Sequence, residues 1–176
     1  MFGDSQHQLI MEEIVFFWEE SSVFSNWSNH PIKLPEDDMT FRTAEHMFMF
    51  EKAKLMNDED LMSLIYCADT PREARTYGIA LNDYDVALWR NKREDILYKV
   101  LLLKTRQHKD VYDALMKTGN SLIAAACPHD RVWAIGLDSE DPKARDPHAW
   151  PGKNLLGKAW MKVRGVMKCP TPENHG

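Results

Sequence analysis

The sequence has few cysteines, no long apolar run and no leader-like start. Its three cysteines, Cys67, Cys127 and Cys169, form no CxxC pair, which argues against a disulfide framework and a cysteine zinc site. The longest apolar runs, such as LIAAAC, are far shorter than a membrane span. The first residues show no basic segment followed by an apolar one, so we expect no signal peptide, no membrane partner and a cytoplasmic location.

The chain also has no excess of basic residues. It contains 22 Lys and Arg against 27 Asp and Glu, for a formal net charge of −5. A protein that binds duplex nucleic acid needs a basic face to neutralise phosphates, so we expect no general binding of this kind. A few local cations would still suffice for a small phosphate-bearing ligand. The glycines form neither GxGxxG nor GxxxxGK[ST], and we expect no cofactor.

What is present is enough apolar material for one core. With 176 residues, of which 44% are apolar and 10% aromatic, the chain is expected to form one domain. We predict a loose N-terminal arm at 1–13, a single domain at 14–168 and a frayed tail at 169–176. Caps, periodicity and turn residues predict the elements. Strands are expected at 14–18, 32–34, 121–127 and 131–137, helices at 43–57, 58–68, from 70 onward, 85–107, 109–119 and 154–168, and a loop at 139–149. This pattern predicts the α+β class, mostly helical with a few short strands.

The helix that contains FRTAEHMFMFEKAK, residues 41–54, carries an acid and an amine on one stripe. At 3.6 residues per turn, Lys52 returns to within about 20° of Glu45, roughly 10 Å along the axis. Phe48 and Met49 lie between them. A carboxylate beside apolar surface has a raised pKa, which suits acid–base chemistry. The spacing equally allows both charged groups to be solvated surface residues, and His46 alone is typical of a structural hydrogen-bonder.

Two further segments contain candidate polar groups. His129 and Asp130 are adjacent, as in metal-dependent phosphohydrolases, but the remaining histidines form no HxxxH or HExxH pattern. We therefore expect no metal site, and Asp130 can instead cap its own turn. The turn from Gly152 to Asn154, at a predicted helix start, could bind an anion through free N–H groups.

Several tryptophans fall in predicted loops or at strand edges. Trp27, Trp133 and Trp150 are of this kind. Such rings can stack on a nucleobase at about 1–3 kcal/mol each. Each is also compatible with an ordinary place in the core.

Six segments resemble motifs of one family, in the same order and with similar spacing. They are FSNW (24–27), FRTAEHMFMFEKA (41–53), WRNKRED (89–95), LLLKTRQHKDVYDALMKTG (101–119), PHDRVWAIGL (128–137) and WPGKNLLGKAWMKVR (150–164). On these segments, the chain is identified as a member of the NADAR (YbiA-like) family, which is associated with NAD and ADP-ribose metabolism. The resemblance runs from about Phe16 to Arg164. It implies an α+β fold and an N-glycosidase that cleaves the bond between a phosphorylated ribose and a nitrogen. The implied substrates are riboflavin-pathway aminopyrimidine ribose phosphates or ADP-ribosylated guanine.

The resemblance also suggests roles for individual residues. Glu45 would stabilise the positive charge that develops at the anomeric carbon. Lys52 would either pair with a phosphate or Glu45, or attack the opened sugar to form a Schiff base. Asp130 would orient water or a ribose hydroxyl. The remaining expected substrate contacts are ring stacking by Trp133 and Trp150, hydrogen bonds from Asn26, His46 and Asn154, and anion binding at Gly152.

The chain departs from the family pattern at several positions. Ala125 stands where many relatives carry Glu, Ile79 where they carry Arg, and Ala134 where they carry Gly. Thr105 replaces the Phe that follows Lys104. A lost carboxylate or arginine would alter substrate choice or weaken catalysis. The alternative function is therefore a catalytically impaired module that binds ADP-ribose or a related nucleotide.

Overall fold

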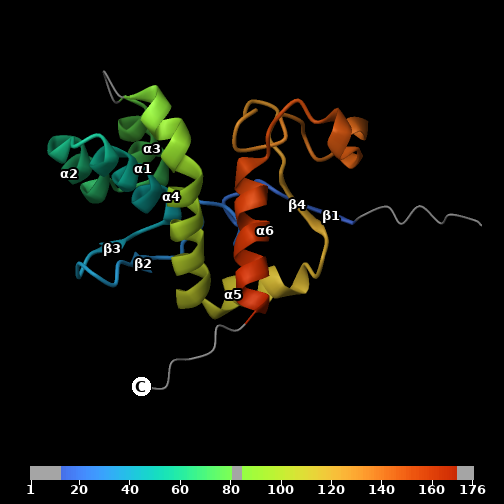
Figure 1. Ribbon diagram of the computed structural model, residues 1–176, viewed down its shortest axis with the longest axis horizontal. Helices are drawn as coiled ribbons and strands as arrows, with labels where there is room; N and C mark the ends of the chain where they lie inside the picture. Colours follow the sequence, from blue (N-terminus) through green and yellow to red (C-terminus); the bar gives the residue numbers. More distant parts are fainter. Residues whose placement is uncertain (1–12, 81–84, 170–176) are drawn as a thin grey trace, which may run out of the picture.

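The computed structural model describes residues 13–80 and 85–169 (Figure 1). Helices dominate, and short strands occur within residues 14–41 and again at 122–125, which confirms the α+β prediction. The strands are β1 (Ile14–Phe17), β2 (Ile32–Lys33), β3 (Thr40–Phe41) and β4 (Leu122–Ala125). The helices are α1 (Ala44–Leu55), α2 (Glu59–Cys67), α3 (Pro71–Ile79), α4 (Val86–Gln107), α5 (Lys109–Lys117) and α6 (Leu155–Lys168). Most of the predicted arm and tail lies outside the described residues.

The long helix α4 divides the molecule. In Figure 1, α1, α2 and α3 lie on one side of α4, and α6 with the β1–β4 pair lies on the other. Strands β1 and β4 pair in parallel, with Ile14 opposite Leu122. Strands β2 and β3 form a short antiparallel pair. Among residues 13–80 and 85–169, we find no helix with the length and apolarity that a membrane crossing requires.

Local capping signals set the helix starts that the sequence predicted. A Ser, Thr or Asp side chain before a helix can accept a hydrogen bond from a free N–H of its first turn. Four such bonds are present. Thr43 accepts the His46 N–H at 3.4 Å, Asp58 the Leu61 N–H at 2.9 Å, Thr70 the Glu73 N–H at 3.1 Å and Asp85 the Leu88 N–H at 2.9 Å. Gly119 has φ +58°, as expected for the residue that ends α5.

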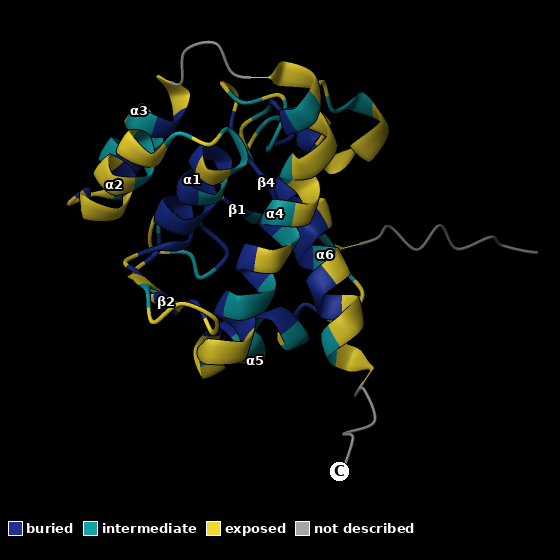
Figure 2. Ribbon diagram, turned by 60° about the vertical axis from the view of Figure 1, so that its left-hand side comes forward, coloured by how far each residue is buried: buried dark blue, intermediate teal, exposed yellow. Residues whose placement is uncertain are grey.

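Helix α1 lies in the interior, and nearly all of its residues are buried (Figure 2). Its Met and Phe side chains belong to the main core, together with Trp160 of α6 and Leu101 of α4. Only Lys54, near the C-terminal end of α1, is exposed, so the helix has almost no solvent face on which to place charges. Glu45 is 2% exposed and Lys52 is 6% exposed. The interpretation of these two residues as solvated surface groups is therefore wrong.

The predicted strand at 131–137 does not form. The carbonyl groups of residues 131–135 instead accept hydrogen bonds from the N–H groups of residues 152–156, across a loop. Only the Ile135 N–H reaches back to β4, at the carbonyl of Ala125. The prediction was wrong because the apolar pattern matches a strand, while the partners are a turn at 152–154 and the first residues of α6. The 139–149 segment, predicted as loop, contains two short 3-10 helices, at Pro142–Arg145 and Pro147–Ala149.

Candidate active site

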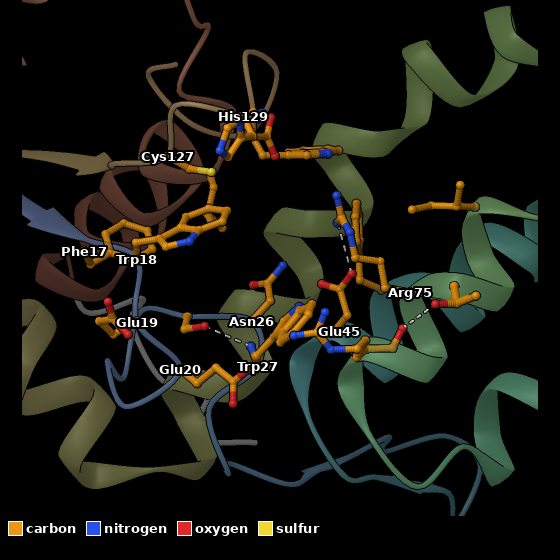
Figure 3. Close-up of a pocket in the computed structure, with 18 residues that line it drawn as sticks. Phe17, Trp18, Glu19, Glu20, Asn26, Trp27, Glu45, Arg75, Cys127 and His129 are labelled. Atoms are coloured by element: carbon orange, nitrogen blue, oxygen red, sulfur yellow. Dashed lines mark hydrogen bonds and ion pairs between the residues drawn. The ribbon is translucent and has the colours of Figure 1, made fainter. Parts of the chain in front are cut away.

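A cavity of about 580 Å³ opens where the end of β1, helix α1, helix α3 and the loop after β4 meet (Figure 3). Its lining combines aromatic rings with charges of both signs. The lining residues are Phe17, Trp18, Glu19, Glu20, Ser25, Asn26, Trp27, Glu45, Phe48, Arg72, Arg75, Thr76, Ile79, Cys127, His129, Asp130, Trp133 and Leu156. Of the nine predicted site residues, Asn26, Glu45, Asp130 and Trp133 lie in this lining.

Glu45 provides the most deeply buried charge of the cavity. The Thr43 cap places it in the first turn of α1, and Arg75 Nη1 lies 3.4 Å from its Oε1 (Figure 3). Burial raises the pKa of Glu45 above its ordinary value. Arg75 and a hydrogen bond from Asn26 oppose this rise, and the nearby charge of Asp130 adds to it. A carboxyl group with a raised pKa keeps its proton to a higher pH than a solvated one, which suits acid–base chemistry.

Asn26 contacts Glu45 twice. Its backbone carbonyl accepts the Glu45 N–H at 2.9 Å, and its side chain hydrogen-bonds the carboxylate. The Asn26 Oδ1 atom is buried and has no hydrogen-bond partner among residues 13–80 and 85–169. Buried polar atoms normally have partners, so this oxygen is a ready acceptor for a ligand hydroxyl or amine.

Asp130 and Trp133, from the loop after β4, both line the cavity. Asp130 Oδ1 accepts the N–H groups of Val132 and Trp133, each at 2.8 Å. The prediction that Asp130 caps its turn is confirmed, and the same residue also lines the cavity. The Trp133 ring meets Phe48 edge to face at 5.2 Å, and Arg93 lies 5.5 Å from it. These contacts hold the indole in one orientation.

The sequence analysis missed the cations of α3. Arg72, Arg75 and Thr76 occupy positions i, i+3 and i+4, which lie on one helix face, and all three line the cavity. The Arg72 guanidinium lies 5.3 Å from the centroid of the Trp27 ring. The Arg-x-x-Arg-Thr spacing after the TPRE helix start was a visible signal. Nothing local in the sequence indicates that this face meets Glu45.

Lys52 lies beside the cavity wall and is not among the lining residues. Its ammonium donates to the carbonyl of Gly78 at 2.7 Å and lies 5.3 Å from the Trp89 ring centroid. Burial, and to a lesser extent the Arg75 charge, lowers the pKa of Lys52. The contact with Gly78 ties α1 to the C-terminal end of α3, the helix that carries Arg75.

His46 and Trp150, predicted to contact substrate, lie outside the lining. The two ring nitrogens of His46 contact Thr43 Oγ1 at 2.8 Å and the Ala68 carbonyl at 3.1 Å. Trp150 donates its Nε1–H to the Ala144 carbonyl at 2.8 Å, in the smaller of the two hydrophobic clusters. Both side chains therefore make structural contacts.

Gly152 and Asn154 also lie outside the lining. The N–H groups of this turn, which were expected to be free, already donate to backbone carbonyl groups. Gly152 N–H donates to Ile135 O at 2.8 Å, and Asn154 N–H donates to Ala134 O at 3.1 Å. The Asn154 side chain bonds β4 twice: its Oδ1 accepts the Ala125 N–H, and its Nδ2 donates to the Ile123 carbonyl. The expectation of an anion site here is wrong, because the turn uses its donors to hold residues 131–135.

The positions at which the chain departs from the family pattern fall in different places. Ile79 lines the cavity and is 62% exposed. Ala125 and Ala134 are fully buried and are not lining residues. The substitution that most directly alters the cavity is therefore the one at position 79.

A family model described as NADAR domain matches residues 16–168 of this chain. This chain belongs to the NADAR family. N-glycosidase R617 of Acanthamoeba polyphaga mimivirus is 31% identical over 147 residues, which cover 81% of this chain and 85% of that protein. Protein irg-1 of Caenorhabditis elegans is 30% identical over 164 residues, covering 85% of this chain and 77% of irg-1. The NMR structure of Escherichia coli YbiA matches with a TM-score of 0.72 and 25% identity, covering 94% of this chain and 92% of YbiA. With several N-glycosidases among its NADAR relatives, the protein is a hydrolase of the glycosylase class.

Proposed function

We propose that this NADAR protein hydrolyses the N-glycosidic bond of a small ribose-phosphate adduct, with Glu45 as the catalytic carboxylate. The observation that carries the proposal is a buried carboxylate with a raised pKa, enclosed by Arg75 and Asn26 in a cavity lined with aromatic rings. Substrates of the expected type are aminopyrimidine ribose phosphates of riboflavin biosynthesis and ADP-ribosylated guanine. In both, a phosphorylated ribose is joined to an amino-bearing ring.

The reaction needs negative charge close to the anomeric carbon. As the C1–N bond breaks, its electron pair goes to the nitrogen and positive charge develops on C1. The Glu45 carboxylate stabilises that charge in a site where little water screens it. A water oxygen then bonds to C1, and the proton it loses balances the nitrogen anion of the leaving ring. Asp130, whose Oδ1 is fixed by its turn, directs its other oxygen to that water.

The substrate phosphate fits the α3 side of the cavity. Arg72 and Arg75 supply guanidinium groups, and Thr76 supplies a hydroxyl, from one face of the helix. Guanidinium groups bind phosphate through paired N–H donors. Because Arg75 is also within 3.4 Å of Glu45, a phosphate held there lies on the ribose side of the reacting bond.

The leaving ring fits the opposite end. In Figure 3, Trp18 and Glu19 lie on the far side of Glu45 from Arg75. Trp18 is 46% exposed, so its ring is available for stacking. The carboxylates of Glu19 and Glu20 can accept hydrogen bonds from ring amino groups, and they repel phosphates. This end therefore favours a free base or nucleoside over a base within a nucleic-acid strand.

For Lys52, the hydrogen bond to Gly78 favours a positioning role over direct attack on the sugar. Borohydride trapping with substrate tests this assignment. A mass increase that is lost in Lys52→Ala would instead establish a Schiff base.

The alternative is a nucleotide-binding module without turnover. The observation in its favour is Ile79, an apolar residue on the cavity lining where many relatives carry Arg. Without an arginine at position 79, one phosphate contact would be missing. This would weaken catalysis while leaving the aromatic rings and Arg72 in place.

Base release from free ADP-ribosylated guanosine and from the riboflavin-pathway intermediate tests the proposal. Glu45→Gln is expected to lower kcat at least about 100-fold, because it removes the charge while keeping the shape. Glu51→Gln is the matched control: Glu51 lies on α1, outside the lining, with an ion pair to Lys99 at 3.8 Å. Ligand-dependent stabilisation of the wild type without turnover would establish the binding module instead.

A further inference from the structure

A buried lysine holds the loop that brings Asn26 and Trp27 to the cavity. Lys104, on α4, is 0% exposed. Its ammonium donates to Val23 O at 2.7 Å, Ser25 O at 2.8 Å and Ser28 Oγ at 2.7 Å. A lysine ammonium has three donors, and here each one meets an oxygen of the same loop.

A second side chain holds the same loop from α6. Trp160 donates its Nε1–H to the carbonyl of Phe24 at 2.9 Å, and the Lys104 ammonium lies 5.7 Å from the Trp160 ring centroid. Three successive carbonyl groups, at residues 23–25, are therefore bound by side chains of two core helices. The loop forms only short turns of its own, such as Ser25 N–H to Ser22 O and Ser28 N–H to Ser25 O, and the side-chain bonds from α4 and α6 fix it to the core.

The loop transmits this anchoring to the catalytic carboxylate. Ser25, which Lys104 binds, directly precedes Asn26. The Asn26 carbonyl accepts the Glu45 N–H at 2.9 Å, and the Asn26 side chain bonds the Glu45 carboxylate. A displacement of the loop would therefore change both the position of Glu45 and one of the hydrogen bonds that set its charge.

A buried ammonium is a costly way to obtain stability alone. Among the ion pairs of the described residues, none joins Lys104 to a carboxylate. Burial lowers the pKa of Lys104 to about 7, and the charge of Asp110, which is bonded to His30, opposes this only from a distance. Burying a charge among neutral oxygens costs several kcal/mol, and an apolar side chain would avoid that cost. What the ammonium supplies, and an apolar residue cannot, is the three-point geometry.

We propose that Lys104 is a positioning residue for the glycosidase reaction, acting through the 23–28 loop and Asn26 on Glu45. This assignment rests on the proposed function, since it names the residue that keeps the Glu45 site in its reactive geometry. Lys104 does not line the cavity and touches no substrate.

The test compares Lys104→Met with Arg164→Met. Arg164 is a matched control because it is a buried cation, 8% exposed, that binds Thr118 Oγ1 at 2.7 Å and Ser121 O at 2.8 Å, away from the lining. Lys104→Met is expected to lower kcat about 10- to 100-fold, the usual effect of a small misplacement of reacting groups. Arg164→Met is expected to keep kcat within about twofold of the wild type. Equal losses in both variants would overturn the proposal.

The pH dependence separates positioning from a general loss of structure. The Asn26 hydrogen bond lowers the pKa of Glu45, so its loss lets burial raise that pKa further. The limb of the pH–kcat profile that reports on Glu45 is therefore expected to move to higher pH in Lys104→Met and to stay in place in Arg164→Met. An unmoved limb in Lys104→Met would contradict action through Asn26.

Amide hydrogen exchange supplies a readout that needs no turnover. The Glu45 N–H is expected to exchange faster in Lys104→Met, relative to amides of the α6 core, and to be unaffected in Arg164→Met. Ser28→Ala, which removes one of the three acceptors, should give a smaller change in the same direction if Lys104→Met fails to fold. Unchanged exchange at Glu45 in both variants would refute the positioning role, whereas absent turnover in the wild type would refute only the glycosidase.

Discussion

Glu45 is buried at a cost that its proposed catalytic role would explain. A carboxylate in the interior is destabilised unless charged or hydrogen-bonding groups surround it, and here Arg75 and Asn26 offset only part of the effect of burial. Residues held in such environments concentrate at functional sites. The spacing of Glu45 to Lys52 left a surface position open, and the resemblance to the NADAR family suggested its catalytic role. Its burial follows from packing around α1 as a whole. Arg72 and Arg75 were missed because their partners are distant in sequence.

The raised pKa predicts how stability depends on pH. Between the ordinary value of 4.5 and the raised folded value, the folded chain binds more protons at Glu45 than the unfolded chain does. The free energy of unfolding therefore falls as pH rises through this window. Glu45→Gln removes this contribution, so the variant should be more stable than the wild type at pH 8, by about 0.5–2 kcal/mol.

Urea unfolding at pH 4 and pH 8 measures the effect. The gain of Glu45→Gln over the wild type should shrink toward pH 4, below the ordinary pKa of 4.5, where Glu45 is mostly protonated in both states. A gain of equal size at both pH values, or a loss at pH 8, would show that the carboxylate is not destabilised by burial.

At the scale of elements, the helices were predictable where their signals are local. The caps at Thr43, Asp58, Thr70 and Asp85 each involve residues three positions apart, so the sequence displays them directly. The 131–137 segment was mispredicted because its partners lie in the turn at 152–154 and at the start of α6. Hydrogen bonds to a turn and a helix start leave no strand-like periodic pattern in the partner segment.

The contact between α6 and β4 predicts opposite effects for two glycines of one helix. A Cβ on Gly157 would lie 2.1 Å from the backbone oxygen of Ile123, whereas a Cβ on Gly165 would meet nothing within 4 Å. Gly157→Ala should destabilise the protein by about 1–3 kcal/mol, because backbone must move to relieve the overlap. Gly165→Ala should stabilise it by about 0.5–1 kcal/mol, because alanine favours the helix.

Thermal unfolding of the two alanine variants tests this packing. A lower Tm for Gly157→Ala and a higher Tm for Gly165→Ala are expected. Similar Tm values for the two variants would mean that α6 does not approach β4 as closely as described.

At the scale of the molecule, we propose that charge selects among substrates at the cavity. The net charge is −5, and Glu19 and Glu20 add acid to the end that we assign to the leaving ring. The strand of a nucleic acid would carry phosphates past these carboxylates and meet repulsion there. The sequence predicted the absence of a basic face, but not that two acids would stand beside the cavity.

The protein is therefore expected to release guanine from free ADP-ribosylated guanosine at least about tenfold faster than from an ADP-ribosylated single strand. The double variant Glu19→Lys, Glu20→Lys should reduce this preference. Glu94→Lys with Asp95→Lys, which makes the same change of charge on the exposed face of α4, should leave it intact. If both double variants reduced the preference to the same extent, net charge, and not the acids at the cavity, would set the choice of substrate.

The central claim is that the Glu45 side chain faces C1 of a bound ribose. A crystal structure of Glu45→Gln with an uncleaved ribose-phosphate adduct measures this directly. We predict that C1 lies about 3–3.5 Å from the side-chain oxygen of residue 45, with the phosphate against α3. A ligand bound elsewhere, or one whose C1 points away from residue 45, would contradict the mechanism.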